Sequence, residues 1–149
     1  MRFGETIGTI RLVPMAAGLA PCENLLVRHA VSPELWHESW EVGRLVLAQR
    51  YRSGPESLKR CLFLTLVHLI EHTNVENLFA SCTPLLGRLY RRFGFDMLVQ
   101  EASRDAAGSY CLIHGTVPGV LRALAGGARE RELAEDILAL RASAEALPC

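Results

Sequence analysis

The apolar run WEVGRLVL at positions 40–47 carries two charged residues, Glu41 and Arg44. Its other residues are mostly bulky or β-branched, a composition typical of a buried strand. An unpaired charge in a protein interior is costly, so buried charges are paired with a neighbour or reach solvent in a cleft. Charges of this kind also gather at functional sites. The run therefore predicts either a structural ion pair or a carboxylate that takes part in chemistry.

The spacing of these charges needs a local irregularity. Glu41 and Arg44 are three positions apart, so a regular strand sends their side chains to opposite faces. Gly43 lies between them, and a β-bulge there, which glycine within a strand often marks, would bring both to one face. Arg11, in the preceding apolar run, is the natural third member. Such a network either satisfies its own charges structurally or leaves Glu41 able to bind a substrate amine.

The segment RYRSGPES at positions 50–57 has the composition of a strand-to-helix turn. Pro55 suits the first turn of a helix, and Glu56 favours its N-terminus. Backbone N–H groups at such a junction bind phosphate, because the helix dipole adds to their partial positive charge. The alternative is an ordinary turn with surface arginines, and both interpretations remain open from the residues alone.

A basic cluster follows in RLYRRFGF, positions 88–95, with Arg88, Arg91 and Arg92. The helix dipole favours cations near the C-terminus of a short helix, so a solvated helix face explains them. They can equally form an anion-binding patch for phosphates or for an acidic carrier protein. Tyr90 in the same stretch is either a half-buried packing residue or a phenol that donates a proton within a cleft.

The motif HLIEH contains His68, Glu71 and His72 and matches the H-x-x-E-H pattern of one class of zinc proteases. A structural interpretation is favoured. Thr65, His68 and His72 form the polar stripe of an otherwise apolar helix, and such a helix turns its polar stripe to water. No third ligand is evident downstream, so we expect no metal.

Length and composition limit the classes of function. The chain has 149 residues and zero formal net charge, which predicts one domain and gives no reason to expect nucleic acid as a partner. No apolar run approaches the length of a membrane span, and the first residues lack the order of a signal peptide, so we expect a cytoplasmic protein. The five cysteines include no CxxC pair, which argues against a disulfide framework. Cys61, Cys82 and Cys111 are expected to be small core residues, the alternative being a reactive thiol.

The pattern of apolar residues and turn signals predicts a mixture of strands and helices. We expect strands at 6–14, 39–51, 75–82, 95–102 and 109–116, and helices at 58–74, 83–95, 117–128 and 129–147, with a short helix in the loop-rich segment 15–36. The last two strands form a hairpin around SRDAAG, and the last helix is amphipathic, with Leu133, Ile137, Leu140, Ala144 and Leu147 on one face. A strand–helix–strand unit at the centre requires a parallel pair. The predicted fold class is α/β: a mixed, mostly antiparallel sheet with a central parallel pair and helices on both faces, in a single domain over residues 1–149.

Three segments together resemble the GNAT acyltransferase superfamily, and within it the branch of acyl-homoserine-lactone synthases and N-acyl-amino-acid synthases. GTIRLVP (8–14) resembles a strand of that branch that ends in proline. WEVGRLVL (40–47) resembles its W-E-x-S-R-F strand, with Gly43 where Ser is usual and Leu45 where Phe is usual. LFASCTPLLGRLYRRFGF (78–95) resembles the strand and helix that end in L-Y-x-x-x-G-F. The resemblance covers residues 6–116 and rests on the order and spacing of the segments.

The resemblance implies a fold in which two central parallel strands splay apart and take the pantetheine arm of an acyl thioester between them. In the lactone-synthase branch, the positions matched by Arg11, Glu41 and Arg44 form a charged network beside the acceptor site. In GNAT enzymes the tyrosine matched by Tyr90 often protonates the leaving thiolate. The phosphates of the donor are implied at the turn before the long helix, here Arg52, Ser53 and Gly54.

Two departures from the family pattern bear on the donor and on the assembly. The phosphate loop Q/R-x-x-G-x-G/A is not cleanly present in RYRSGPES, which favours the lactone-synthase-like branch or a carrier-protein donor. The chain also begins almost at GTIRLVP, whereas family members carry a first strand and helices before it. The chain is then a truncated frame, a degenerate relative, or a protomer whose open sheet edge is covered by a partner, for example in a homodimer.

The expected function is N-acyl transfer, from acyl-CoA or the phosphopantetheine of an acyl-carrier protein to the amine of a small molecule such as an amino acid or S-adenosylmethionine. The expected catalytic residues are Glu41, Arg44, Arg11 and Tyr90, and the expected donor-binding residues are Arg52, Ser53 and Gly54. Two alternatives remain open: an acetyl-CoA-dependent GNAT acetyltransferase, and a non-catalytic GNAT-like module that binds an acyl ligand or docks a partner.

Overall fold

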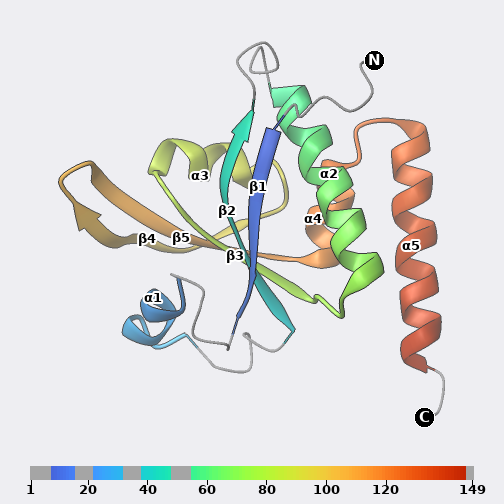
Figure 1. Ribbon diagram of the computed structural model, residues 1–149, viewed down its shortest axis with the longest axis horizontal. Helices are drawn as coiled ribbons and strands as arrows, with labels where there is room; N and C mark the ends of the chain where they lie inside the picture. The colour runs from blue at the N-terminus through green and yellow to red at the C-terminus, as the bar shows by residue number, and fades with distance from the viewer. Residues whose placement is uncertain (1–7, 16–21, 32–37, 48–54, 147–149) are drawn as a thin grey trace.

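A five-stranded mixed sheet forms the centre of the molecule, with its strands in the order β1-β2-β3-β5-β4 (Figure 1). The computed structural model describes residues 8–15, 22–31, 38–47 and 55–146. Within these residues the strands are β1 (Gly8–Pro14), β2 (Ser39–Leu47), β3 (Asn77–Cys82), β4 (Asp96–Asp105) and β5 (Gly108–Thr116). The helices are α1 (Cys22–Arg28), α2 (Pro55–His72), α3 (Pro84–Arg91), α4 (Val117–Leu124) and α5 (Ala128–Ala146).

The strand pairing confirms the predicted fold class. β2 and β3 form a parallel pair at the centre, and α2 connects them. The pairs β1–β2, β3–β5 and β4–β5 are antiparallel. The sheet is therefore mixed, with its one parallel pair where the strand–helix–strand unit required it.

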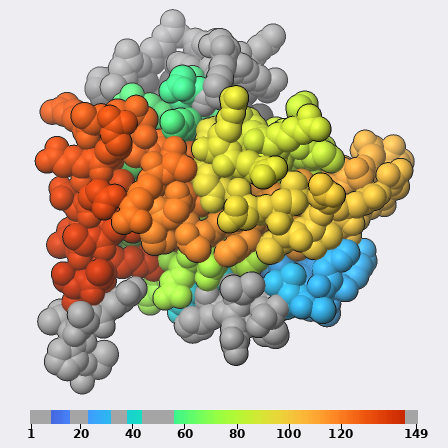
Figure 2. All heavy atoms as spheres, turned by 180° about the vertical axis from the view of Figure 1, so that it is seen from behind, coloured from blue at the N-terminus to red at the C-terminus, as the bar shows by residue number. Residues whose placement is uncertain are grey.

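Helices cover both faces of the sheet (Figure 1). Leu78 and Ala80 of β3 face the larger core, which they share with residues of α2 and α4. Phe79 between them points to the other face, where it packs with Leu26 of α1. Because side chains alternate along a strand, this one apolar run supplies both cores. Seen from behind, α3 lies against the start of β4, and α4 lies next to α5 (Figure 2).

Local sequence signals explain where the helix α3 begins and ends. The Thr83 hydroxyl accepts a hydrogen bond from the backbone N–H of Leu86, and a proline occupies the first turn. The chain leaves the helix through Gly94, whose φ of 90° favours glycine. No helix in the described residues is long and apolar enough to cross a membrane.

The hairpin turn is shorter than predicted. We expected the six residues of SRDAAG to form the turn, whereas β4 runs to Asp105 and β5 begins at Gly108. The Asp105 side chain accepts a hydrogen bond from the Ala107 backbone N–H at 2.8 Å, and Gly108 has a φ of 131°. These two features close the chain within two residues, so the polar residues before them join the strand.

Two predictions about helix faces are wrong. Leu133 and Leu140 of α5 are 43% and 72% exposed, whereas Ile137 of the predicted face is partly buried. The helix packs through Ala134, together with Ile137 and Leu138. Thr65 of α2 is half-buried against the sheet rather than on the water-facing stripe with the exposed His68 and His72. In both helices the apolar residues extend around much of the circumference, so periodicity alone does not select the packed face.

Candidate functional site

The parallel strands β2 and β3 part after a short contact. Their register contains three pairs, the last of which joins Glu41 to Phe79. Beyond that point β2 continues to Leu47 beside β1, and β3 continues to Cys82 beside β5. Each strand therefore turns backbone donors and acceptors toward the gap, where an extended ligand with amide groups can pair with them. This confirms the predicted splay of the central strands.

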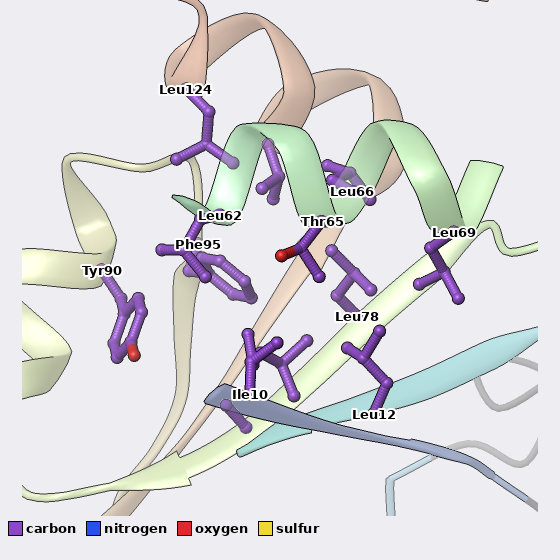
Figure 3. Close-up of a pocket in the computed structure, with 13 residues that line it drawn as sticks. Ile10, Leu12, Leu62, Thr65, Leu66, Leu69, Leu78, Tyr90, Phe95 and Leu124 are labelled. Atoms are coloured by element: carbon purple, nitrogen blue, oxygen red, sulfur yellow. The ribbon is translucent and has the colours of Figure 1, made fainter. Parts of the chain in front are cut away.

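An apolar slot lies between the sheet and α2, on one face of this gap (Figure 3). It is narrow, and its free volume is about 20 Å³, room for about one water molecule. Tyr90 projects from α3 at one end, and Leu12 and Leu69 lie at the other (Figure 3). Apart from the hydroxyls of Tyr90 and Thr65 its wall is hydrocarbon; the lining residues are Ile10, Leu12, Val42, Leu62, Thr65, Leu66, Leu69, Leu78, Ala80, Tyr90, Phe95, Val120 and Leu124. Such a wall suits an alkyl chain.

The Tyr90 phenol is held in a mostly apolar setting. Its ring meets Phe93 and Phe95 edge-on, with centroid distances of 6.1 and 5.6 Å. Burial raises the pKa of Tyr90 above its usual value, and the neighbouring Cys82 thiol adds to the rise. The phenol is therefore protonated at neutral pH and can act as a proton donor.

Glu41 lies on the opposite face of the sheet from the slot. Its neighbours across the register are Val13 and Phe79, which belong to the core on the α1 side. The carboxylate is buried, and its Oε1 lies 3.3 Å from a terminal nitrogen of Arg11. Arg11 is partly exposed, and its Nε is buried with no hydrogen-bond partner among the described residues. The predicted ion pair between these two residues is confirmed.

The predicted irregularity at Gly43 is also present. Thr9 and Arg11, two positions apart on β1, face Val46 and Gly43, three positions apart on β2. The extra residue of this bulge is therefore on β2, directly after Gly43. A Cβ atom at Gly43 would lie 3.7 Å from the Glu41 Oε1, an ordinary van der Waals distance, so position 43 borders the carboxylate.

Several predicted positions stay predictions. Arg44 belongs to β2, but its side chain is outside the described residues, as are Arg52, Ser53 and Gly54. The helix predicted to follow that turn begins at Pro55. The end of α3, the helix that follows β3 in the chain, carries three exposed arginines: Arg88, Arg91 and Arg92. Both interpretations of them, a solvated helix face and an anion-binding patch, therefore remain open.

The HLIEH histidines form no metal centre among the described residues, where no three metal-ligating side chains cluster. The rings of His68 and His72 stack with centroids 4.1 Å apart. His72 donates from Nδ1 to the His68 backbone carbonyl at 2.8 Å, a contact within the helix.

The sequence did not predict a pair of sulfur atoms beneath α3. Cys82 and Cys111 lie opposite each other on β3 and β5, with their Sγ atoms 3.7 Å apart. Both are free thiols and buried, as the core interpretation predicted. Burial, followed by the neighbouring Cys111, raises the pKa of Cys82 to about 12. Only the strand register brings the two residues together.

Comparison with solved structures identifies the fold. The acyl-homoserine-lactone synthase MesI, described as CoA-dependent, matches with a TM-score of 0.58 at 18% identity over 87% of this chain and 65% of its own. FeeM, an N-acyl amino acid synthase from uncultured soil microbes, matches with a TM-score of 0.59 at 17% identity over 78% of this chain and 68% of its own. The CoA-dependent lactone synthase BjaI, solved with SAM and isopentyl-CoA, matches with a TM-score of 0.57 at 13% identity over 93% of this chain and 62% of its own.

These similarities confirm at the level of fold the resemblance to lactone synthases and N-acyl-amino-acid synthases. The chain spans about two thirds of the length of these structures. No protein-family model matches the sequence, and the search of curated proteins found no match.

Proposed function

We propose that the protein is an N-acyltransferase that moves an acyl group from a thioester to the amine of a small molecule. The observation that carries the proposal is the arrangement around the gap between β2 and β3. An apolar slot with a protonated phenol lies on one face, and a buried ion-paired carboxylate lies on the other. A thioester bound in the gap would then place its acyl chain in the slot on one side and receive the acceptor amine from the other side.

The proposed chemistry assigns one proton movement to each face. The amine nitrogen attacks the thioester carbonyl carbon, a C–N bond forms, and the C–S bond breaks. Glu41 orients the amine and takes its surplus proton, directly or through water, while Arg11 and Arg44 hold the carboxylate. Tyr90 gives its proton to the leaving thiolate. Exchange with water restores both groups, and the products are an amide and a free thiol.

We propose a medium or long acyl chain because the wall of the slot is almost entirely hydrocarbon. The free volume of about 20 Å³ is smaller than such a chain, so the lining side chains would have to move apart to admit it. Each methylene then buried there would contribute about 0.8 kcal/mol. The alternative of an acetyl-CoA-dependent enzyme is tested by the acetyl-CoA arm of the experiment below. A binding module without turnover remains an outcome of the experiment below.

The donor is acyl-CoA or an acylated carrier protein, and different residues support each. Arg52, Ser53 and Gly54, immediately before α2, are proposed to hold its phosphates. MesI and BjaI are described as CoA-dependent. The exposed Arg88, Arg91 and Arg92 would suit an acidic carrier protein. For the acceptor, FeeM is named for amino acids and BjaI was solved with SAM, so we propose a small amine of that kind.

The test is a screen for stabilisation and for thiol release. The protein is mixed with acetyl-CoA, octanoyl-CoA, palmitoyl-CoA or an octanoylated carrier protein, each with and without amino acids and S-adenosylmethionine. The proposal expects a higher melting temperature with long-chain donors and thiol release only when an amine is present. Stabilisation without release indicates a binding module, and best turnover with acetyl-CoA indicates an acetyltransferase. Absence of any response contradicts the proposal.

A further inference from the structure

The helix α3 rests on the sheet through a residue that has no side chain. Gly87 is buried, and a Cβ atom built there would lie 2.9 Å from the Cys111 Sγ, 3.5 Å from the Met97 Cε and 3.9 Å from the Cys82 Sγ. The first of these distances is shorter than real Cβ contacts allow. Three sulfur-containing side chains thus form a floor, and the helix backbone lies directly on it. We call this contact the α3 seat.

The floor has little freedom to yield. Cys111 is fully buried. Its thiol lies 3.3 Å from the Cys82 carbonyl and 3.8 Å from the carbonyl of Thr83, the residue that caps α3. Rotating the thiol away from Gly87 would break these contacts inside a closely packed core. A side chain at position 87 would therefore lift the helix instead.

Tyr90 follows Gly87 by three positions on the same helix, so both residues face the sheet. Its phenol lines the slot (Figure 3), and the Cys82 thiol of the floor is close enough to act on it electrostatically. The height of α3 above the floor thereby sets the distance between the phenol and the gap where β2 and β3 part.

We propose that Gly87 is a positioning residue: by seating α3 directly on Cys111, it places the Tyr90 hydroxyl at the reacting thioester. This inference rests on the proposed function, in which Tyr90 is the proton donor. Helix propensity does not explain a glycine there, since alanine is the better helix former. The α3 seat requires a residue without a side chain at position 87, and the L-Y-x-x-x-G-F motif around Tyr90 does not include that position.

The experiment pairs a disruptive change with its structural remedy. Gly87→Ala adds the clashing methyl, Cys111→Ala removes the sulfur that it meets, and the double variant carries both. Gly127→Ala is the matched control, since a Cβ there meets nothing within 4 Å. The readouts are kcat and KM for thiol release and the alkaline ultraviolet titration of Tyr90, isolated by subtracting the Tyr90→Phe spectrum.

Misplacing a catalytic group by about 1 Å can cost roughly 100-fold in rate. For Gly87→Ala we expect at least a tenfold loss of kcat with little change in KM, and a Tyr90 titration moved toward that of exposed tyrosine. The double variant should return to within about threefold of Cys111→Ala. An unchanged titration and kcat in Gly87→Ala, or a double variant as impaired as the single one, would overturn the proposal.

The design separates this inference from the proposed function. If Tyr90→Phe keeps full turnover, the proton-donor role fails, yet the titration still reports whether Gly87 positions the phenol. If Gly87→Ala does not fold, the double variant decides: recovery of the fold with the wild-type Tyr90 titration supports the seat, and continued unfolding contradicts it.

Discussion

The two faces of the sheet differ in how they are built. The face with the slot is a broad apolar core to which α2, α3, α4 and α5 all contribute. The face with Glu41 has a small core centred on Phe79 and one seven-residue helix, α1, together with the Arg11–Glu41 ion pair. Apolar packing thus positions the Tyr90 phenol on the first face, and an ion pair positions the Glu41 carboxylate on the second. The difference implies that truncating a core side chain costs more stability on the first face than on the second.

The largest expected effect tests the difference in packing. Phe63 is 1% exposed in the larger core, and Leu26 is fully buried under α1. Phe63→Ala should lower the free energy of unfolding by about 3–5 kcal/mol, and Leu26→Ala by about 2 kcal/mol, because a short helix over a small core relaxes more easily into the cavity. Urea unfolding measures both. Equal losses would show that the small core under α1 relaxes no more easily into a cavity than the larger core does.

The next effect concerns the charged face. Glu41→Gln keeps the size of the side chain but removes its charge from beside Arg11. We expect thiol release to fall about 100-fold, within the range for losing a general base, while the protein stays folded. Glu76→Gln, which changes an exposed carboxylate, is the control and should leave turnover unchanged. Turnover retained in Glu41→Gln would make the ion pair purely structural.

The sequence predicted the elements better than the contacts between them. The strand run around Glu41, its bulge at Gly43 and the cap of α3 follow from residue types at short range. The packed face of α5 did not, because Leu133 and Leu140 gave a regular period although Ala134 lies against the core. The slot and the Cys82–Cys111 pair depend on register between distant strands, which local patterns do not encode. Charge and turn chemistry are local, whereas packing is global.

An alkaline titration should weaken the slot face. The pKa of Cys82 is raised from 9.0 to about 12, so the folded state keeps a proton that the unfolded chain loses in that interval. Stability is therefore full below pH 9 and falls as the pH rises toward 12. Tyr90 acts in the same direction above pH 10. Cys82→Ala should flatten the decline measured by urea unfolding at pH 8, 9 and 10, and an unchanged slope would mean that the thiol is solvated.

The smallest expected effect is an acid titration of the α1 face. The His114 Nε2 lies 2.8 Å from the Asn77 Oδ1. Because a carboxamide oxygen only accepts hydrogen bonds, the Nε2 is the donor. Burial lowers the pKa of His114 below 6.5, and Asp96, which faces it from β4, opposes this shift. The unfolded chain therefore binds a proton before the folded one, and stability is lost as the pH falls below 6.5. His114→Gln keeps an amide donor for Asn77 without a titrating group, so it should lose less stability than wild type between pH 7 and 5. If both lose the same amount, the acid sensitivity comes from groups other than His114. Titration then does not distinguish the α1 face of the sheet from the slot face.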